Sequence, residues 1–134
     1  MIEGISHLTF IVKDLERTAE FLRFIFDGQE VYSSGEDNIY SLSREKFFLI
    51  SGQWFALMEG DSLSDRTYNH VAFKINDEEF DIYESRVHAL GIDFKPPRPR
   101  IKGEGRSLYF YDYDNHLFEL HTGTLSERLA GYAR

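Results

Sequence analysis

The chain has 134 residues, which suits one compact domain with a real core and leaves little room for a second. Its formal net charge of −8 argues against nucleic acid or an anionic membrane surface as the main partner, and the absence of cysteine excludes disulfides, thiolate nucleophiles and cysteine-based metal sites. Because the segment MIEGISHLTF has no basic region followed by an apolar run, and no stretch approaches membrane-spanning length, we expect a cytosolic protein.

The first half of the chain predicts a strand, a helix and then a set of short strands. Residues 4–12 are rich in β-branched and aromatic side chains and predict a buried strand. Asp14 can cap a helix whose apolar residues recur at helical spacing, and Gly28 ends that helix. Glycine and polar turns separate the short strands that we expect at 30–33, 39–43, 47–50 and 54–58.

The same order of elements begins again after a polar connector. Residues 68–75 predict a strand, and Asp77 can cap a helix that Gly91 closes. Beyond it we expect a loop rich in proline and glycine at 95–106, strands at 107–111 and 117–122, and a short helix at 125–132.

This restart is an internal repeat, and a repeat determines the fold class more firmly than propensity does. A shift of 63 residues lays HLTFIVKD over HVAFKIND, so that His7 falls on His70. The shift also aligns Gly28 with Gly91, Phe47 with Phe110, Phe55 with Phe118, Leu57 with Leu120 and Gly60 with Gly123.

We therefore predict an α+β fold in which two tandem βαβββ modules form a cupped, barrel-like mixed sheet around a shared cavity. The chain would be one domain, 1–134. Module one would cover about 4–60, module two about 67–123, and a C-terminal helix about 124–132.

The repeat also brings together candidate metal ligands. His7 and His70 become equivalent residues on equivalent first strands, while Glu119 falls over Ala56. Glu119 lies in an apolar strand, and a buried carboxylate needs a partner. Two imidazoles and one carboxylate suit a divalent first-row metal that keeps positions open for water and substrate. Two alternatives stay open: His121 on the same strand face could ligate, or the histidines are core residues and Glu119 meets an arginine.

These residues resemble the vicinal oxygen chelate superfamily, which includes glyoxalases, extradiol dioxygenases and drug-resistance proteins. Within it the chain is most similar to the fosfomycin-resistance proteins, above all the FosX-type epoxide hydrolases. The resemblance covers essentially the whole length and rests on GISHLTFIVKDLE, SLSREKFFLI, TYNHVAFKI and RPRIKGEGRSLYFYDYDNHLFELHTGTLSERL. It implies that His7, His70 and Glu119 hold Mn(II), with other divalent first-row metals as alternatives.

The resemblance also implies a reaction, the addition of water to the epoxide of fosfomycin. In the FosX type a glutamate in the S-R-E-K-F segment acts as general base, and here that residue is Glu45. From the residues alone, Glu45 between Arg44 and Lys46 indicates only a solvated charged turn. The assignment of the base therefore depends on the resemblance.

A phosphonate dianion in a chain of this net charge requires a local cationic pocket. The residues alone offer the cations Arg98, Arg100, Lys102, Arg106 and Arg128 and the hydroxyls of Thr9, Tyr68, Ser107 and Tyr109. By resemblance to glutathione-using relatives, the substrate contacts match Thr9, Tyr68, Ser107, Tyr109 and Arg128, and Trp54 matches an aromatic residue that lines the cavity. The loop departs from those relatives, so Arg98 and Arg100 both remain candidates for the role of their lysine.

Other functions stay open for the same scaffold. A thiol transferase would open the same epoxide with glutathione or bacillithiol. An Fe(II) oxygenase would use a similar ligand set, although extradiol enzymes of this superfamily are generally longer. A non-catalytic drug-binding protein would not need the intact ligands His7, His70 and Glu119. The resemblance further implies a homodimer with exchanged modules, in which His7 of one chain joins His70 and Glu119 of the other.

Overall fold

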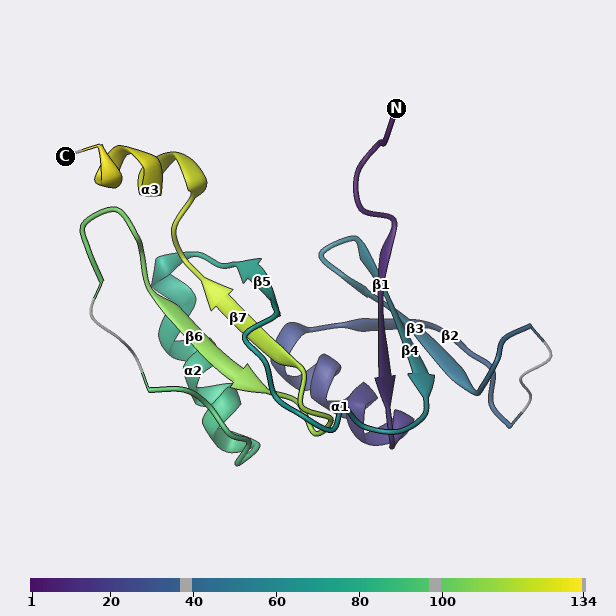
Figure 1. The fold of residues 1–134 in the computed structure, drawn as a ribbon. Coiled ribbons are helices and arrows are strands. Elements are labelled where there is room, and N and C mark those ends of the chain that lie inside the picture. Colours follow the sequence, from purple (N-terminus) through teal and green to yellow (C-terminus); the bar gives the residue numbers. More distant parts are fainter. Residues whose placement is uncertain (37–39, 97–99, 134) are drawn as a thin grey trace. The chain divides into compact units, whose positions relative to one another are not determined.

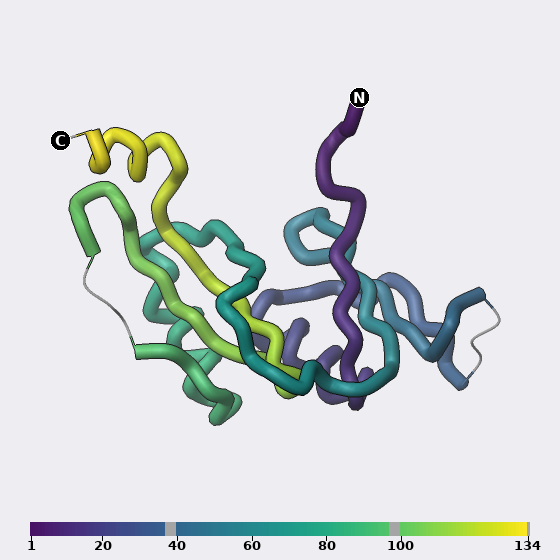
Figure 2. The backbone as a smooth tube through the Cα atoms, viewed as in Figure 1, coloured from purple at the N-terminus to yellow at the C-terminus, as the bar shows by residue number. Residues whose placement is uncertain are grey.

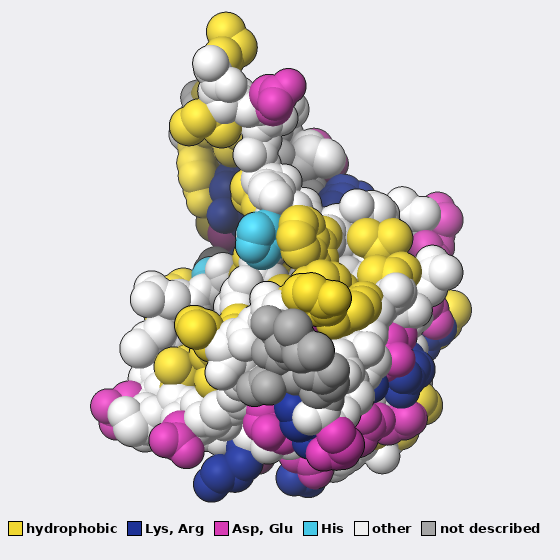
Figure 3. All heavy atoms as spheres, turned by 90° about the vertical axis from the view of Figure 1, so that its right-hand side faces the viewer, with side chains coloured by type: hydrophobic (Ala, Val, Ile, Leu, Met, Phe, Trp, Pro, Cys, Tyr) yellow, Lys and Arg dark blue, Asp and Glu magenta, His cyan; other side chains and the backbone are white. Residues whose placement is uncertain are grey.

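The computed structural model describes residues 1–36, 40–96 and 100–133, which form two compact units, Met1–Ser64 and Asp65–Arg134. Both units belong to the mixed α+β class and contain one sheet each (Figure 1). Within the described residues no helix is long and apolar enough to cross a bilayer. On the face that Figure 3 shows, acidic and basic side chains are interspersed.

The first unit is a four-stranded sheet with one helix. Its strands have the order β1-β4-β3-β2, in which β1 runs parallel to β4 and the other pairs are antiparallel. Its elements are β1 (His7–Val12), α1 (Leu15–Phe26), β2 (Gln29–Ser33), β3 (Glu45–Ile50) and β4 (Gln53–Glu59).

Helix α1 follows from its capping residue and its apolar stripe. The Asp14 carboxylate accepts a hydrogen bond from the Arg17 backbone N–H at 3.0 Å. The buried residues Leu15, Leu22 and Ile25 recur at helical spacing and pack toward the sheet. The chain then leaves the helix through a left-handed residue at position 27 and Gly28, where a Cβ atom would approach the Leu22 carbonyl oxygen to 3.1 Å.

The second unit is a three-stranded sheet of order β5-β7-β6, again with a parallel first pair, and α2 lies along one face of it (Figure 1). Its elements are β5 (His70–Lys74), the 3₁₀ helix η1 (Asp77–Glu79), α2 (Phe80–Ala89), β6 (Ser107–Tyr111), β7 (Leu117–His121) and α3 (Leu125–Tyr132).

The second unit has one strand fewer than the predicted βαβββ order, among its described residues. In place of a counterpart to β2 there is a single bridge between Phe94 and Phe110, with hydrogen bonds of 2.9 Å from the Lys95 N–H to the Tyr109 carbonyl and from the Tyr111 N–H to the Asp93 carbonyl. Prolines at positions 96, 97 and 99 have no N–H to continue such a ladder. Chain chemistry thus explains why this edge stays short.

Two local predictions need correction. The strand expected at 39–43 does not form over 40–43, which are turn and bend residues, and residue 39 lies outside the described part of the chain. Asp77 does not cap the second helix, since Asn76 precedes η1 without a side-chain cap. The Asp77 carboxylate instead accepts a hydrogen bond from Arg106 Nε at 2.8 Å.

The strand register corrects one detail of the repeat. Ala56 pairs with Thr9 and Phe47, whereas Glu119, 63 positions later, pairs with Ala72 and Tyr109. Phe47 is therefore equivalent to Tyr109, a shift of 62, and Phe48 is equivalent to Phe110. The β6–β7 connection is one residue longer than its counterpart between β3 and β4, which accounts for the slip.

Each sheet has a helix-covered face and a face that we call the helix-free face. Val12, Phe48 and Phe55 are buried on the helix-covered side of the first sheet, and Phe110 and Leu120 on that of the second. Because cross-strand partners point to the same side, the register fixes the rest. The helix-free face carries His7, Thr9, Ile11, Glu45, Phe47, Leu49, Trp54, Ala56 and Met58 in the first unit, and His70, Ala72, Lys74, Ser107, Tyr109, Tyr111, Leu117, Glu119 and His121 in the second.

The loop before β6 lies against α3, as Figure 2 shows for the backbone. Gly103 has a φ of 90°, and a Cβ atom there would lie 2.6 Å from the Glu127 carbonyl oxygen. Thr124 begins α3 with a reciprocal capping box to Glu127. The loop that carries Arg100 therefore packs at Gly103 against α3, the helix that carries Arg128.

Candidate functional site

The best-defined part of the site is the pair formed by His70 on β5 and Glu119 on β7. Glu119 is 5% exposed, and its Oε1 lies 3.0 Å from His70 Nε2. His70 Nδ1 lies 2.7 Å from the Tyr68 backbone carbonyl oxygen, which can only accept a hydrogen bond, so Nδ1 carries the proton. In neutral His70, Nε2 is then a lone pair directed at a carboxylate oxygen. Two lone pairs at this distance need a cation or a proton between them, so these two residues fit a divalent metal.

Glu119 is also held from its other oxygen. The Ser107 hydroxyl donates to Glu119 Oε2 at 2.5 Å and lies 2.7 Å from His121 Nδ1. Since the hydroxyl proton is used on Glu119, His121 donates from Nδ1 to Ser107 Oγ. His121 Nε2 then faces Arg128 Nη2 at 3.4 Å. Both nitrogens of His121 are thereby engaged by neighbours on β6 and α3.

A tyrosine pair lies beside His70 and Glu119 on the same face. The Tyr68 and Tyr109 hydroxyl oxygens are 2.9 Å apart. Burial, the hydrogen bond with Tyr68 and the charge of Glu119 raise the pKa of Tyr109 to about 12, against a lowering contribution from Arg100. Tyr109 is therefore a neutral phenol at physiological pH, a state in which it can donate to an anionic oxygen.

Cations surround this part of the second unit. Burial lowers the pKa of His121, and the positive charges of Arg128, Arg100 and Lys74 act in the same direction, against the charge of Glu119. Arg100 Nη1 is buried and, among the described residues, has no hydrogen-bond partner. A buried guanidinium N–H without an acceptor favours an anionic ligand such as a phosphonate.

The loop that carries Arg100 is fixed by a buried carboxylate. Glu104 is 6% exposed, its Oε1 accepts a hydrogen bond from the Ile101 N–H at 2.8 Å, and its Oε2 lies 3.6 Å from Arg100 Nη1. Sequence reasoning missed Glu104. The signal available in the sequence was its position between two glycines, Gly103 and Gly105, which indicates a tight turn, and both adopt positive φ in the structure.

The first unit contributes His7, Trp54 and Thr9 to its own helix-free face. The His7 ring stacks on Trp54 with centroids 4.1 Å apart and an interplanar angle of 30°, and its Nδ1 lies 3.0 Å from the Ser6 hydroxyl. Trp54 Nε1 is buried and has no hydrogen-bond partner among the described residues. Thr9 is exposed and pairs in register with Ala56.

Glu45 at the start of β3 is 8% exposed, which corrects the interpretation of a solvated charged turn. Its flanking cations are on the opposite face of the strand and serve other carboxylates. Arg44 Nη1 bonds to Glu59 Oε2 at 3.1 Å, and Lys46 Nζ bonds to Glu30 Oε1 at 3.0 Å. Glu45 thus stands on the helix-free face without an ion pair to either sequence neighbour.

The predicted metal ligands are divided between the two units, with His7 in the first and His70 and Glu119 in the second. Within the described residues no group of three or more His, Cys, Asp or Glu side chains could hold a metal. Arg98 lies outside the described residues. Arg106 is directed to Asp77 and lies over the Phe80 ring at 4.3 Å, which leaves it on the α2 side of the unit.

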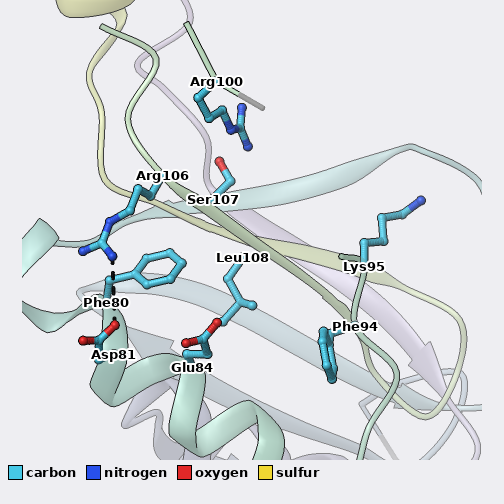
Figure 4. Close-up of a pocket in the computed structure, with 9 residues that line it drawn as sticks. All are labelled: Phe80, Asp81, Glu84, Phe94, Lys95, Arg100, Arg106, Ser107 and Leu108. Atoms are coloured by element: carbon cyan, nitrogen blue, oxygen red, sulfur yellow. Dashed lines mark ion pairs between the residues drawn. The ribbon is translucent and has the colours of Figure 1, made fainter. Parts of the chain in front are cut away.

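A cavity of about 300 Å³ lies between α2, β6 and the preceding loop (Figure 4). It shares only Arg100 and Ser107 with the predicted substrate contacts and excludes the pair His70 and Glu119, so we do not assign the site to it. The lining residues are Phe80, Asp81, Glu84, Phe94, Lys95, Arg100, Arg106, Ser107 and Leu108.

Comparisons with known proteins show the family of the chain. A family model described as the Glyoxalase/Bleomycin resistance protein/Dioxygenase superfamily matches residues 4–120. The fosfomycin resistance protein FosX of Listeria monocytogenes is 63% identical over 132 residues, 98% of both chains. A metallothiol transferase FosB of Shouchella clausii is 36% identical and covers 100% of this chain and 90% of its own.

A solved structure is similar over almost the whole chain. It is the crystal structure of a glutamate-to-glutamine mutant of FosX from Listeria monocytogenes, complexed with Mn(II) and 1S,2S-dihydroxypropylphosphonic acid. It aligns with a TM-score of 0.90 at 60% identity and covers 98% of this chain and 99% of its own. The similarity extends over both units, and therefore over both halves of the predicted ligand set.

Proposed function

We propose, since this chain belongs to the Glyoxalase/Bleomycin resistance protein/Dioxygenase superfamily, that it is a Mn(II)-dependent hydrolase which adds water to the epoxide of fosfomycin and so confers resistance. The observation that carries the proposal is the buried Glu119 carboxylate facing the lone pair of His70 Nε2. The identity of 63% to a FosX protein supports the reaction.

His7, His70 and Glu119 would hold the metal. When bound, Mn(II) supplies Lewis acidity for the oxirane oxygen and a fixed positive charge for the phosphonate. His70 is prepared for this role because the Tyr68 carbonyl fixes its tautomer, and Glu119 because Ser107 fixes its second oxygen.

Glu45 is the proposed general base. A carboxylate on the helix-free face can take one proton from water as the water oxygen attacks an epoxide carbon. The carbon–oxygen bond of the ring breaks in the same step, and the released oxygen gains a proton to give the second hydroxyl of a vicinal diol. No thiol takes part in this balance, which distinguishes hydration from the thiol transfer that the name of the FosB relative describes.

The phosphonate would bind to neutral hydroxyls and guanidinium groups. Tyr68 and Tyr109 supply phenolic donors, and Arg100 and Arg128 supply charge beside His121. Thr9 and Trp54 complete the proposed shell. Ser107 stays a candidate by resemblance, with its hydroxyl proton used on Glu119, and Arg98 stays a candidate on sequence grounds alone. Arg100 is favoured because its buried Nη1 makes no hydrogen bond within the described residues, with the Glu104 carboxylate 3.6 Å away.

We further propose a cytoplasmic homodimer with exchanged modules, in which His7 of one chain meets His70 and Glu119 of the other. Co-expression of a His7→Ala chain with a Glu119→Gln chain separates the alternatives. With exchanged modules, each mixed dimer contains one intact ligand set and hydration activity returns. If the ligands come from one chain, both chains are defective and the mixed dimers stay inactive. Gel filtration measures the oligomeric state, and cell fractionation tests the location.

The test of the function uses purified protein, Mn(II) and fosfomycin, with and without glutathione, followed by phosphorus NMR. Formation of the diol without thiol is expected. Turnover only in the presence of thiol would overturn the hydrolase in favour of a transferase, and binding without turnover would indicate a drug-binding protein.

A further inference from the structure

A continuous chain of hydrogen bonds joins α3 to the candidate metal ligands. It runs from Arg128 to His121, Ser107 and Glu119, and ends at His70. The groups at the two ends fix the protons in between: the Tyr68 carbonyl, which can only accept, sets the tautomer of His70, and the Arg128 guanidinium, which can only donate, requires a lone pair on His121 Nε2. A single arrangement of protons therefore satisfies every link from Arg128 to Glu119, and it leaves lone pairs of Glu119 Oε1 and His70 Nε2 facing each other.

The position of His121 argues against a role as a metal ligand itself. Nε2 faces the cationic Arg128 at 3.4 Å, where a divalent ion would be repelled, and Nδ1 is used on Ser107 at 2.7 Å. The ring is also closely seated, since a Cβ atom at Gly123 would come within 3.0 Å of Nε2 and 2.8 Å of the Glu104 carbonyl oxygen. Packing of this kind fixes a ring in one orientation.

We propose that His121 is a positioning residue for the metal ligand Glu119, acting through Ser107. His121 holds the Ser107 oxygen as an acceptor, which directs the Ser107 proton to Glu119 Oε2 and leaves Oε1 turned toward His70. Partners of this kind orient the ligating atoms of a metal site, and their loss lowers metal affinity. This inference deepens the proposed function and rests on its assignment of Glu119 as a ligand.

The two nitrogens of His121 can be tested separately. His121→Asn keeps a donor near the place of Nδ1 and loses Nε2, His121→Gln keeps a polar group near the place of Nε2 and loses the donor, and His121→Phe loses both. The probe is Mn(II) alone, titrated into the full-length protein without fosfomycin and followed by electron paramagnetic resonance of the free ion.

His121→Phe is expected to weaken Mn(II) binding by about 10- to 100-fold. His121→Asn should recover most of that loss, and His121→Gln should not. In a Ser107→Ala background, His121→Phe should add little, because the two residues act as one unit. His88→Phe, on the exposed side of α2, is the matched control and should bind Mn(II) like the wild type.

Three results would overturn the inference: unchanged Mn(II) affinity in His121→Phe, fully additive effects of His121→Phe and Ser107→Ala, or a loss in His121→Asn as large as in His121→Phe. The last result would make His121 a direct ligand. If His121→Phe does not fold, as judged by thermal unfolding, the comparison of Asn with Gln and the Ser107→Ala variant still decide. The Mn(II) titration contains no fosfomycin, so its result does not depend on whether the protein is a hydrolase. Failure of the hydrolase proposal and failure of this inference can therefore be told apart.

Discussion

The helix-free faces of the two units share one backbone plan and carry different chemistry. Equivalent positions hold His7 and His70 on the first strands. Beyond that pair the faces diverge, with Ala56, Met58, Glu45 and Phe47 in the first unit where the second has Glu119, His121, Ser107 and Tyr109. The second unit thus has a connected polar network, and the first has one histidine and one buried carboxylate among apolar side chains.

This difference indicates a division of labour. The network of the second unit fixes the orientation of the two proposed metal ligands, His70 and Glu119, as a metal site requires. The first unit leaves Glu45 without an ion pair to its neighbours, which suits a group that must exchange a proton. The duplicated scaffold provides two equivalent surfaces, and substitutions at a few register positions give each its role.

If the two units are equivalent scaffolds, truncating equivalent core residues should lower the free energy of unfolding by equal amounts. Phe48 and Phe110 are register-equivalent and both fully buried. Phe48→Ala and Phe110→Ala should each lower the free energy of unfolding by about 4 kcal/mol, from lost burial and the cavity left behind. Denaturant titration measures both. A difference of more than about 2 kcal/mol between the two would show that the units do not share an equivalent core.

The next largest effect concerns the metal. Glu119→Gln should reduce Mn(II) affinity by more than about 100-fold, since it removes a proposed ligand with its charge. Asp81→Asn is the matched control, because Asp81 is an exposed carboxylate on α2 in the same unit. Isothermal titration with Mn(II) measures both variants. Wild-type affinity in Glu119→Gln would remove this residue from the ligand set.

Lys46 gives a pH-dependent comparison on the helix-covered face of the first unit. Burial would lower the pKa of Lys46, but hydrogen bonds and charge from Glu30 and Glu16 outweigh it, so the pKa is raised above its ordinary value of 10.5. Lys46→Met should cost about 2 kcal/mol near neutral pH through loss of charged hydrogen bonds.

The pH dependence follows from the direction of that shift. A raised pKa in the folded state means that the contribution of Lys46 is complete below 10.5 and is lost as pH rises through the folded-state pKa. The difference in free energy of unfolding between wild type and Lys46→Met should therefore be smaller at about pH 11 than at about pH 8. An equal difference in free energy of unfolding at both pH values would mean that Lys46 stabilises the fold by packing alone.

The smallest effect separates the two helix starts. Asp14 caps α1. Asp77, the equivalent residue in the repeat, instead accepts a hydrogen bond from Arg106 near the surface. Asp14→Ala should cost about 1 kcal/mol and Asp77→Ala about 0.5 kcal/mol, the usual values for a capping side chain and an exposed ion pair. Thermal unfolding of both variants checks the order, and equal losses would contradict it.

Much of the fold was predictable because the repeat appears directly in the sequence. Periodicity and the 63-residue shift predict that His7 and His70 are equivalent residues on equivalent strands. They also predict the position of Glu119 on a strand and the helices α1 and α2. The absence of a fourth strand among the described residues of the second unit was not anticipated, although the proline-rich segment after Lys95 was visible in the sequence. Phe47 is equivalent to Tyr109 and not to Phe110, because the turn between β6 and β7 has one extra residue. The 63-residue spacing alone does not reveal this extra residue.

The sequence suggested residue types for the candidate site but not the hydrogen bonds that connect them. Two histidines and a glutamate could be selected as ligands from the repeat. The hydrogen bond from Ser107 to Glu119 depends on side-chain orientations on β6 and β7. The burial of Glu104 depends on how the loop before β6 folds. The burial of Glu45 was likewise hidden by its charged neighbours, which point to the other side of β3.

The central claim, that the first unit supplies the base while ligands of the second unit help to hold the metal, is tested most directly by Glu45→Gln. Mn(II) affinity and the rate of fosfomycin hydration are measured on the same preparation, the rate by phosphorus NMR. We predict wild-type Mn(II) affinity with hydration slowed by about 10² to 10⁴, the usual contribution of a general base. Hydration at the full rate, or loss of Mn(II) binding together with the rate, would contradict the division between the two units.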